Sequence, residues 1–386
     1  MVAGNGKTTT AGARAGAAGP HAPWLAGRAA AIMRAVRCID RVPAMDDLAA
    51  VTKLRDFWNA ARFRPGAARG HYESWFQRAN HPSRPLAFWI RYTIFCPAGR
   101  PADAVGELWA IRFDGEAGRI AALREARPLA ACRFSATGLD VAVGDARLYD
   151  GGLAGEAAGQ GHRIAWDLRY GGGGAPLLLL PEDLYARALP KAKALVGTPG
   201  AVYDGRLVVD GEPIAIEGWP GSQNHNWGSR HTDRYAWGQV AGFDDAPDAF
   251  LECTTARVRL GPAWSPVWSP WMTLLVLRAG GREYALNGIG QALRARGGYR
   301  YFEWEFDTAA AGVRIRGRIH APREAFVGLT YGNPPGGAKT CLNCKIAACE
   351  LVLERPGMPP MALRTAHRAA FEILTGATDH GVPVVV

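Results

Sequence analysis

The segment 218–243 reads GWPGSQNHNWGSRHTDRYAWGQVAGF and is the part of the chain richest in side chains able to do chemistry. It places five hydrogen-bonding side chains between Gly221 and Trp227, with His225 among them. A histidine exchanges protons near neutral pH, and a neighbouring amide can hold its ring in one tautomer. We expect a turn over the mouth of a β-barrel, with His225 as base or donor and Trp227 as an apolar wall. A structural loop whose amides pair with the backbone is an equal alternative.

Acid–base chemistry also needs a carboxyl group, and the sequence offers three candidates. Glu73 stands among the aromatic residues of YESWF (72–76), and apolar surroundings raise the pKa of a carboxyl group, as a general acid requires. A structural carboxylate paired with a nearby arginine is the favoured alternative for Glu73. Glu217 and Glu252 flank the His225 segment on expected strands. We take Glu252 as the catalytic acid, with Glu73 as the alternative.

Alternating patterns indicate that β-strands position these residues. Apolar and polar residues alternate along 163–170, 302–307 and 313–320, as expected for strands with one wet face. The strands expected at 87–95, 107–113 and 234–243 are apolar or aromatic on both faces, so they lie between layers or line a cavity. Asp210-Gly211 between two such runs predicts a hairpin. The only helices expected are 47–61 and a short one within 181–189.

Composition favours an all-β fold, and the length suggests two or three domains. The chain has 386 residues with 48 glycines and 26 prolines, which suits many short strands joined by turns. Strand density falls near 190–200, so we expect domains at 46–195 and 196–386. Residues 1–45 read as a disordered tail, or as sequence upstream of a true start at Met33 or Met45.

Several classes of function are disfavoured. The formal net charge is +10, but the arginines are scattered, so we expect no nucleic-acid partner. Cys341-x-x-Cys344-x4-Cys349 lacks the second ligand pair of a zinc site, and we expect no metal and no cofactor. The seven cysteines form no disulfide framework, which favours a reducing, cytoplasmic location. No apolar run is long enough to span a membrane. A peripheral membrane contact through residues 24–38 is the alternative to the disordered tail.

Three segments together resemble a known family. YESWFQRANHPSRPLAFWIRYTIF, GELWAIRFD and GWPGSQNHNWGSRHTDRYAWGQ are similar to the carotenoid 1,2-hydratase (hydroxyneurosporene synthase) type, grouped with tocopherol cyclase-like and AttH-like proteins. The resemblance implies two tandem lipocalin-like (calycin) barrels and acid–base chemistry on a C=C bond of an isoprenoid. It matches His225 and Trp227 to a His-Asn-Trp-Gly box and implies a proton-donating carboxylate on a neighbouring strand, near a tyrosine. Here LECTTARV offers Glu252 without an adjacent tyrosine.

These observations predict a hydratase- or cyclase-like lyase that acts on an apolar polyene or terpenoid held in a cavity within or between the barrels. The alternative is a bilobed carrier of a lipophilic molecule without chemistry. The expected catalytic residues are His225, Trp227 and Glu252. The expected substrate-binding residues are Tyr72, Glu73, Trp89, Arg91, Asn224, Asn226, His231, Trp237 and Gln239. The oligomeric state is left open.

Overall fold

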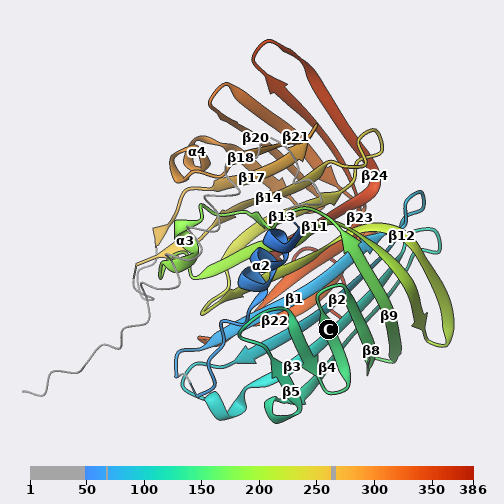
Figure 1. The fold of residues 1–386 in the computed structure, drawn as a ribbon. Helices are drawn as coiled ribbons and strands as arrows, with labels where there is room; N and C mark the ends of the chain where they lie inside the picture. The colour runs from blue at the N-terminus through green and yellow to red at the C-terminus, as the bar shows by residue number, and fades with distance from the viewer. Residues whose placement is uncertain (1–47, 67, 262–266) are drawn as a thin grey trace, which may run out of the picture. The chain divides into compact units, whose positions relative to one another are not determined.

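Two large antiparallel sheets, formed one after the other along the chain, dominate the structure, a computed structural model (Figure 1). It describes residues 48–66, 68–261 and 267–386, so the expected tail at 1–45 lies outside the described residues. The described residues belong to one compact unit that spans 39–386. The all-β prediction is confirmed.

The first sheet has the order β4-β3-β2-β1-β12-β11-β9-β8-β7-β6-β5, with β10 paired to β11. It curls until β4 lies against β8 and β9, so it nearly closes into a barrel. Its strands are β1 (His71–Asn80), β2 (Leu86–Cys96), β3 (Val105–Asp114), β4 (Arg119–Pro128), β5 (Cys132–Phe134), β6 (Asp140–Val143), β7 (Ala146–Tyr149), β8 (Gly152–Gly159), β9 (His162–Gly172), β10 (Leu177–Leu178), β11 (Ala192–Val209) and β12 (Glu212–Gly228).

The second sheet has the order β18-β17-β14-β13-β24-β23-β21-β20-β19, with β22 paired to β23. It also curls, and β17 lies against β19 and β20. Its strands are β13 (Arg234–Ala241), β14 (Phe250–Arg257), β17 (Met272–Ala279), β18 (Arg282–Leu286), β19 (Arg296–Arg300), β20 (Glu303–Ala310), β21 (Val313–His320), β22 (Val327–Gly332), β23 (Ala338–Arg355) and β24 (Met358–Thr375). A separate pair is formed by β15 (Arg259–Leu260) and β16 (Val267–Trp268).

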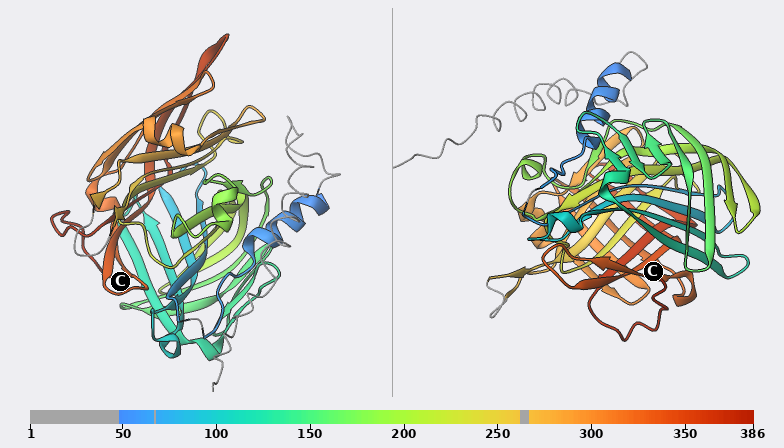
Figure 2. Two further views of the ribbon diagram at one scale, coloured as in Figure 1. Left: turned by 90° about the vertical axis from the view of Figure 1, so that its left-hand side faces the viewer. Right: turned by 90° about the horizontal axis from the view of Figure 1, so that it is seen from below.

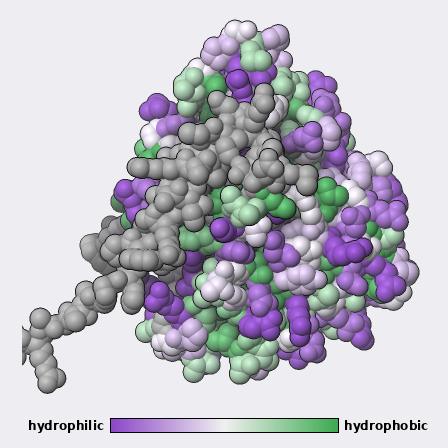
Figure 3. Space-filling model, viewed as in Figure 1, coloured by the Kyte–Doolittle hydropathy of each residue, from purple (hydrophilic) through white to green (hydrophobic). Residues whose placement is uncertain are grey.

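Helices are few and short in the described residues, as the sequence predicts. The longest, α2 (Leu48–Asn59), buries Val51, Leu54 and Trp58 and lies against the first sheet beside β11 (Figure 2). The others are α3 (Asp183–Ala186), α4 (Ile289–Arg294) and the 3-10 turns η2 (Pro101–Asp103), η3 (Leu129–Ala131) and η4 (Arg323–Ala325). On the face shown in Figure 3, hydrophobic and hydrophilic residues are interspersed over the described elements.

Three apolar clusters explain why some strands are apolar on both faces. One cluster fills the inside of the first sheet and a second fills the inside of the second sheet. A third lies between the sheets and joins Trp89 and Trp109 of the first to Trp237 and Tyr331 of the second. Strand β2 therefore turns Ile90 into its own barrel and Trp89 toward the other sheet.

The hairpin predicted at Asp210-Gly211 is confirmed. It joins β11 to β12, and both residues have positive φ, 52° for Asp210 and 91° for Gly211, as a two-residue turn between twisted strands requires. Both of these long strands pair within the first sheet, so that sheet ends at Gly228. Residues 196–228, which the sequence analysis placed with the second barrel, thus belong to the first sheet. The division into domains stays a prediction.

The turn expected over a barrel mouth at 221–228 is wrong, because these residues form the last part of β12. Its neighbours on both sides satisfy its backbone: β12 pairs with β1 along 221–228 and with β11 on its other edge. The two glycines thus mark close strand approach rather than a loop.

Close approach makes Gly221 a sensitive position. A Cβ atom at Gly221 would lie 2.0 Å from the backbone oxygen of Arg78 on β1. Backbone cannot swing aside as a side chain can, so we expect Gly221→Ala to lower the free energy of unfolding by about 1–3 kcal/mol. Thermal and urea unfolding measure this. The matched control is Gly298→Ala on β19, where a Cβ meets nothing within 4 Å; equal losses in both variants would contradict the explanation.

Candidate active site

Strand β12 separates the expected site residues onto two faces. Alternate residues of a strand point to opposite sides. His225 and Trp227, opposite Trp75 and Glu73 of β1, face the inside of the first barrel. Their neighbours Ser222, Asn224 and Asn226, opposite Arg78, Phe76 and Ser74, face the second sheet. The segment that looks like one site in the sequence therefore contributes to two.

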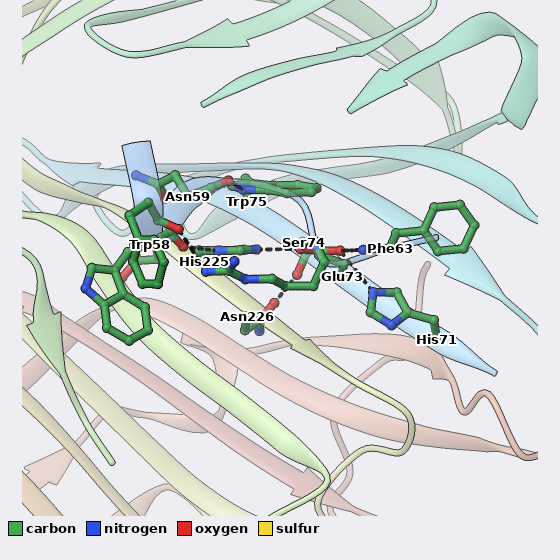
Figure 4. A network of polar contacts seen from close by, with 12 residues as sticks. Trp58, Asn59, Phe63, His71, Glu73, Ser74, Trp75, His225 and Asn226 are labelled. Carbon is green, nitrogen blue, oxygen red and sulfur yellow. Dashed lines mark hydrogen bonds and ion pairs between the residues drawn. The ribbon is translucent and has the colours of Figure 1, made fainter. Parts of the chain in front are cut away.

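On the barrel side, Glu73 is the centre of a network that we call the anchor network (Figure 4). Its Oε1 accepts hydrogen bonds from the backbone N–H of Arg62 (2.7 Å) and from Nε2 of His225 (2.8 Å). Its Oε2 accepts from the backbone N–H of Phe63 (2.8 Å) and from Nε2 of His71 (2.9 Å). The carboxyl group is fully buried, yet hydrogen bonds from the two histidines hold its pKa at about 2, against the effect of burial.

His225 is held as firmly as Glu73. Its Nδ1 lies 2.7 Å from the carbonyl oxygen of Trp58, at the end of α2, so both ring nitrogens face acceptors. The ring stacks on Trp75 with a centroid separation of 4.7 Å, and Trp227 lies at the same distance. Since neither His225 nor Glu73 is exposed to solvent, this network fastens α2 and residues 62–63 to β1 and β12.

A second network lies in the buried interface between the two sheets, which the third apolar cluster fills and which we call the gap. Its members, which we call the intersheet network, are Arg78, Ser222, Asn224, Gln239 and Glu252. Glu252 of β14 accepts hydrogen bonds from Trp237 Nε1 and Gln239 Nε2, both at 2.8 Å. The amide of Gln239 also donates to Asn224 Oδ1 (2.7 Å), which ties β13 to β12. The network thus joins the two sheets through buried side chains.

Arg78 gives the intersheet network a direction. An arginine can only donate, and Arg78 Nε lies 2.8 Å from Gln239 Oε1, so the amide oxygen of Gln239 must point at Arg78. The NH₂ group of Gln239 therefore points at Glu252. Burial nevertheless outweighs these donors and raises the pKa of Glu252 to about 7, so a fraction of this carboxyl group is protonated at neutral pH.

Aromatic rings and a buried ion pair surround Glu252. Phe76 lies 6.1 Å, between ring centroids, from both Trp89 and Trp237. Lys345 Nζ lies 5.6 Å from the Trp89 ring and 5.5 Å from the Trp237 ring. It donates to Glu372 Oε1 (2.7 Å) and to Asn343 Oδ1 (2.6 Å). Its positive charge is therefore compensated within the second sheet.

The remaining expected residues lie farther along the same gap. Arg91 of β2 stands over the Tyr331 ring at 4.7 Å. Tyr72 stacks on His231 with centroids 3.9 Å apart, and His231 in turn faces Tyr331 at 5.8 Å. Burial, followed by the charges of Arg91 and Lys339, lowers the pKa of His231 to about 3, so this ring is neutral.

The structure therefore divides the expected residues. Glu73, His225 and Trp227 meet in the anchor network, while Glu252 lies across β12 with Trp237, Gln239 and Asn224. The expected trio of His225, Trp227 and Glu252 is not assembled, because β12 turns His225 and Trp227 into the first barrel, whereas Glu252 lies beyond the other face of β12, on β14. Asn226 bonds to Ser74 on the side of the gap.

Sequence reasoning missed three charged members of the gap: Arg78, Lys345 and Glu372. Lys345 and Glu372 each stand between apolar neighbours, in CLNCKIAAC and AAFEILT, and the first of these segments was judged only as a thiol motif. Arg78 follows Gln77 in a strand that has several other polar residues. A charge between apolar neighbours was the available signal for Lys345 and Glu372, because a buried charge needs a partner. Arg78 gives no such signal.

Other candidate features lie elsewhere. Among the described residues no group of histidines, cysteines and carboxylates has the arrangement of a metal site. Cys341, Cys344 and Cys349 are buried thiols on β23. No helix in the described ranges is long and apolar enough to cross a membrane. An open hollow of about 710 Å³ lies on β19–β21, β23 and β24. Charged and apolar side chains line it, and none of them belongs to an expected site residue.

The names of the two proteins of similar sequence described below state no activity. No protein-family model matches the chain. Two Mycobacterium tuberculosis proteins, the uncharacterized proteins Rv0493c (strain H37Rv) and MT0513 (strain CDC 1551), are each 24% identical over 318 residues. The match covers 80% of this chain and 88% of each of theirs.

The chain is also similar to solved structures. A Nitrosomonas europaea protein assigned as AttH is 15% identical, with a TM-score of 0.48 over 82% of this chain and 97% of the other. Kievitone hydratase from Nectria haematococca is 12% identical, with a TM-score of 0.49 over 83% and 95%. CghA is 11% identical, with a TM-score of 0.47 over 83% and 94%.

Proposed function

We propose that the protein is a hydratase- or cyclase-like enzyme that protonates a C=C bond of an apolar isoprenoid or polyene between the two sheets. The observation that carries the proposal is Glu252, a buried carboxyl group with a pKa raised to about 7 whose two side-chain partners, Trp237 and Gln239, both donate. Because the partners supply hydrogens, the acid's own proton is left for a substrate. A general acid works best with a pKa near the working pH.

The chemistry begins with transfer of the Glu252 proton to one alkene carbon. The π electrons form the new C–H bond, and the other alkene carbon becomes a cation. The faces of Trp237, Phe76 and Trp89 stabilise a cation in a dry site. Water then adds to the cation, or a second C=C bond closes a ring. In either case the proton released afterwards returns to the Glu252 carboxylate, so the acid is regenerated.

In this proposal the anchor network supports the site without touching the substrate. His225 and Glu73 have partners at every hydrogen-bonding atom and lie inside the first barrel. They fix β1 and β12, and β12 in turn presents Asn224 to Gln239. The role of His225 thus becomes structural rather than the proton relay that its residue type suggested.

Deuterium incorporation tests the proposal without knowledge of the substrate. The purified protein is incubated in D₂O with apolar polyene and terpenoid compounds, and products are analysed by mass spectrometry. Protonation of carbon by Glu252 places one deuterium in a non-exchanging C–H position of each product. Hydration adds the mass of water as well, whereas cyclisation does not. Products without carbon-bound deuterium would contradict protonation of the alkene.

A carrier without chemistry is the second candidate, because the buried aromatic side chains between the sheets would also enclose an apolar ligand that is released unchanged. Glu252 is 2% exposed and Gln239 is not exposed at all, so a ligand must enter between the sheets. A carrier releases its ligand unchanged on extraction, takes up no deuterium, and shows no turnover with any compound tried. These results together would show that the protein is a carrier and not an enzyme.

The hydrogen bond from Trp237 gives a testable pH effect. It favours the charged form of Glu252, so it lowers the pKa of that group. In Trp237→Phe the ring face remains and the N–H is lost. We expect the alkaline limb of the turnover–pH profile to move up by roughly 0.5–1 pH unit, the equivalent of one hydrogen bond. Trp304→Phe, in the core of the second barrel, serves as the control. If the alkaline limb does not move in Trp237→Phe, Glu252 is not the group whose titration sets that limb.

A further inference from the structure

Three buried donors without partners lie on one face of β2. In the described residues Trp89 Nε1, Arg91 Nε and Thr93 Oγ1 have no hydrogen-bond partner. The three residues alternate along the strand, so their side chains all point into the gap between the sheets. They are 1%, 4% and 3% exposed, so water does not take the place of the missing acceptors. A buried polar group without a partner is costly and needs an explanation.

Arg91 is the charged member of this row, and its surroundings hold it in place without neutralising it. Its guanidinium lies over Tyr331 at 4.7 Å, with Trp89 and Trp109 at 5.8 Å and 5.9 Å. Stacking uses the face of a guanidinium and leaves the N–H groups on its edge free to donate. An arginine so placed is ready to bind a planar acceptor such as a carboxylate.

The carboxylates near Arg91 bind other groups. Glu107, on the neighbouring strand β3, accepts from Arg124 Nη2 (3.1 Å) and from Trp109 Nε1 (3.1 Å). Asp233 pairs with Lys339 (3.1 Å) and with Arg230 (2.9 Å). Among the described residues none forms an ion pair with Arg91. Arg78 also has no ion pair in the described residues, but it donates to Gln239, to Asn80 and to the carbonyl oxygen of Arg368. Arg91 has neither an ion pair nor a hydrogen-bond partner there, so its positive charge is available to a ligand with a negative charge.

We propose that Arg91, with Trp89 and Thr93 beside it, binds the carboxylate of an apolar carboxylic acid that lies along β2 between the sheets. A chain of aromatic contacts leads from this end to the acid: Arg91 to Trp89, Trp89 to Phe76, and Phe76 to Trp237, which donates to Glu252. A substrate held by its carboxylate at Arg91 thus extends its apolar part toward Glu252. The position of the reacting C=C bond near Glu252 rests on the proposed function. The carboxylate site at Arg91 is independent of that function.

Three ligands with the same C15 tail test the site by isothermal titration calorimetry at pH 7.5: farnesoic acid, farnesol and farnesyl diphosphate. We expect farnesoic acid to bind about 10- to 100-fold more tightly than farnesol, the effect of one charge-assisted hydrogen-bonded pair. Farnesyl diphosphate binds no more tightly than farnesoic acid, because a single cation does not neutralise its charges. Tighter binding of the diphosphate would assign the site to phosphate esters and overturn the carboxylate proposal.

Variants separate the site from general effects of charge and folding. Arg91→Met should lower the affinity for farnesoic acid to that for farnesol and leave farnesol binding unchanged. Arg91→Lys keeps the charge and should keep part of the preference, and Thr93→Val supplies a second, nearly isosteric variant should Arg91→Met fold poorly. The control is Arg163→Met, which removes a surface arginine paired with Glu156 on the same sheet.

The outcomes distinguish this proposal from the proposed function. Equal binding of acid and alcohol by the folded wild type, a preference that survives Arg91→Met, or no binding of any of the three would each overturn the carboxylate site. Glu252→Gln should bind farnesoic acid as the wild type does. If no product contains deuterium but the Arg91-dependent preference for the acid is observed, the protein is a carrier of apolar carboxylic acids. If products contain deuterium but the preference is absent, the proposed enzyme function is retained and the carboxylate site is rejected.

Discussion

Glu252→Gln should lower the turnover number by about 10²–10⁴-fold while the protein stays folded, the contribution expected of one general acid. Glutamine keeps the size of the side chain, and its oxygen can still accept from Trp237 Nε1 or Gln239 Nε2. It cannot deliver a proton to carbon. Ligand affinity should therefore change little, whereas chemistry is nearly lost. Turnover is measured with the compound that takes up deuterium, and affinity by titration with the same compound.

The same group should set the pH dependence of the wild type. The acid must be protonated to react, and burial raises the pKa of Glu252 to about 7. Turnover is therefore high below about pH 7 and falls as the pH rises through this value. The alkaline limb should disappear in Glu252→Gln, whose residual rate does not depend on this group.

A control shows whether the loss is specific to the acid. Glu372→Gln changes another buried carboxylate of the gap, one that binds Lys345 and Asn343 rather than Glu252. We expect it to affect stability more than the pH profile. If Glu252→Gln keeps its turnover, the acid is misassigned; if Glu372→Gln alone abolishes the alkaline limb, Glu372 takes its place.

The positions of the strands can be predicted from the sequence more readily than the side-chain contacts between strands. Alternation identifies β9, β20 and β21, and Asp210-Gly211 identifies the β11–β12 hairpin, because these features are local. Strands apolar on both faces were expected to lie between layers, and β2 does so. The pairing of Glu73 with His225 depends on the register of β1 against β12, which joins residues far apart in the chain and leaves no local signal.

The loop expected at His225 failed for a related reason. Glycines and amides are typical of turns, and GSQNHNWG contains several. In the structure the glycines admit neighbouring backbones and the amides serve the intersheet network, so tertiary contacts decide the conformation. Strand alternation then separates His225 from Asn224, two neighbours that the sequence presents as one unit.

The anchor network predicts a large loss of stability in Glu73→Gln. Each oxygen of Glu73 accepts one backbone N–H, that of Arg62 or that of Phe63. Glutamine has a single oxygen, so in either orientation its NH₂ group must face a backbone N–H that cannot become an acceptor. A buried donor left without its acceptor costs about 1–3 kcal/mol, and more where the lost acceptor was charged. Urea unfolding at pH 7 measures the loss, and Glu116→Gln, which breaks an exposed pair with Arg84, should cost less than about 1 kcal/mol.

Acid should remove this difference. The folded-state pKa of Glu73 is about 2, below its ordinary value of 4.5, so its stabilising effect is complete above pH 4.5 and is lost as the pH falls toward 2. The gap in unfolding free energy between wild type and Glu73→Gln should therefore narrow over this range. A gap that is independent of pH would show that the charge of Glu73 does not stabilise the fold.

Activity of the same variant decides between an anchor and a catalytic pair. At a temperature well below its unfolding midpoint, folded Glu73→Gln should turn over substrate within a few-fold of the wild type. The anchor network contacts Glu252 indirectly, through the backbones of β1 and β12 and then through Arg78, Ser222 and Asn224, which bind Gln239. A folded Glu73→Gln protein that loses turnover as fully as Glu252→Gln would return Glu73 and His225 to the reaction. The two glutamine variants thus separate what holds the strands in place from what moves the proton.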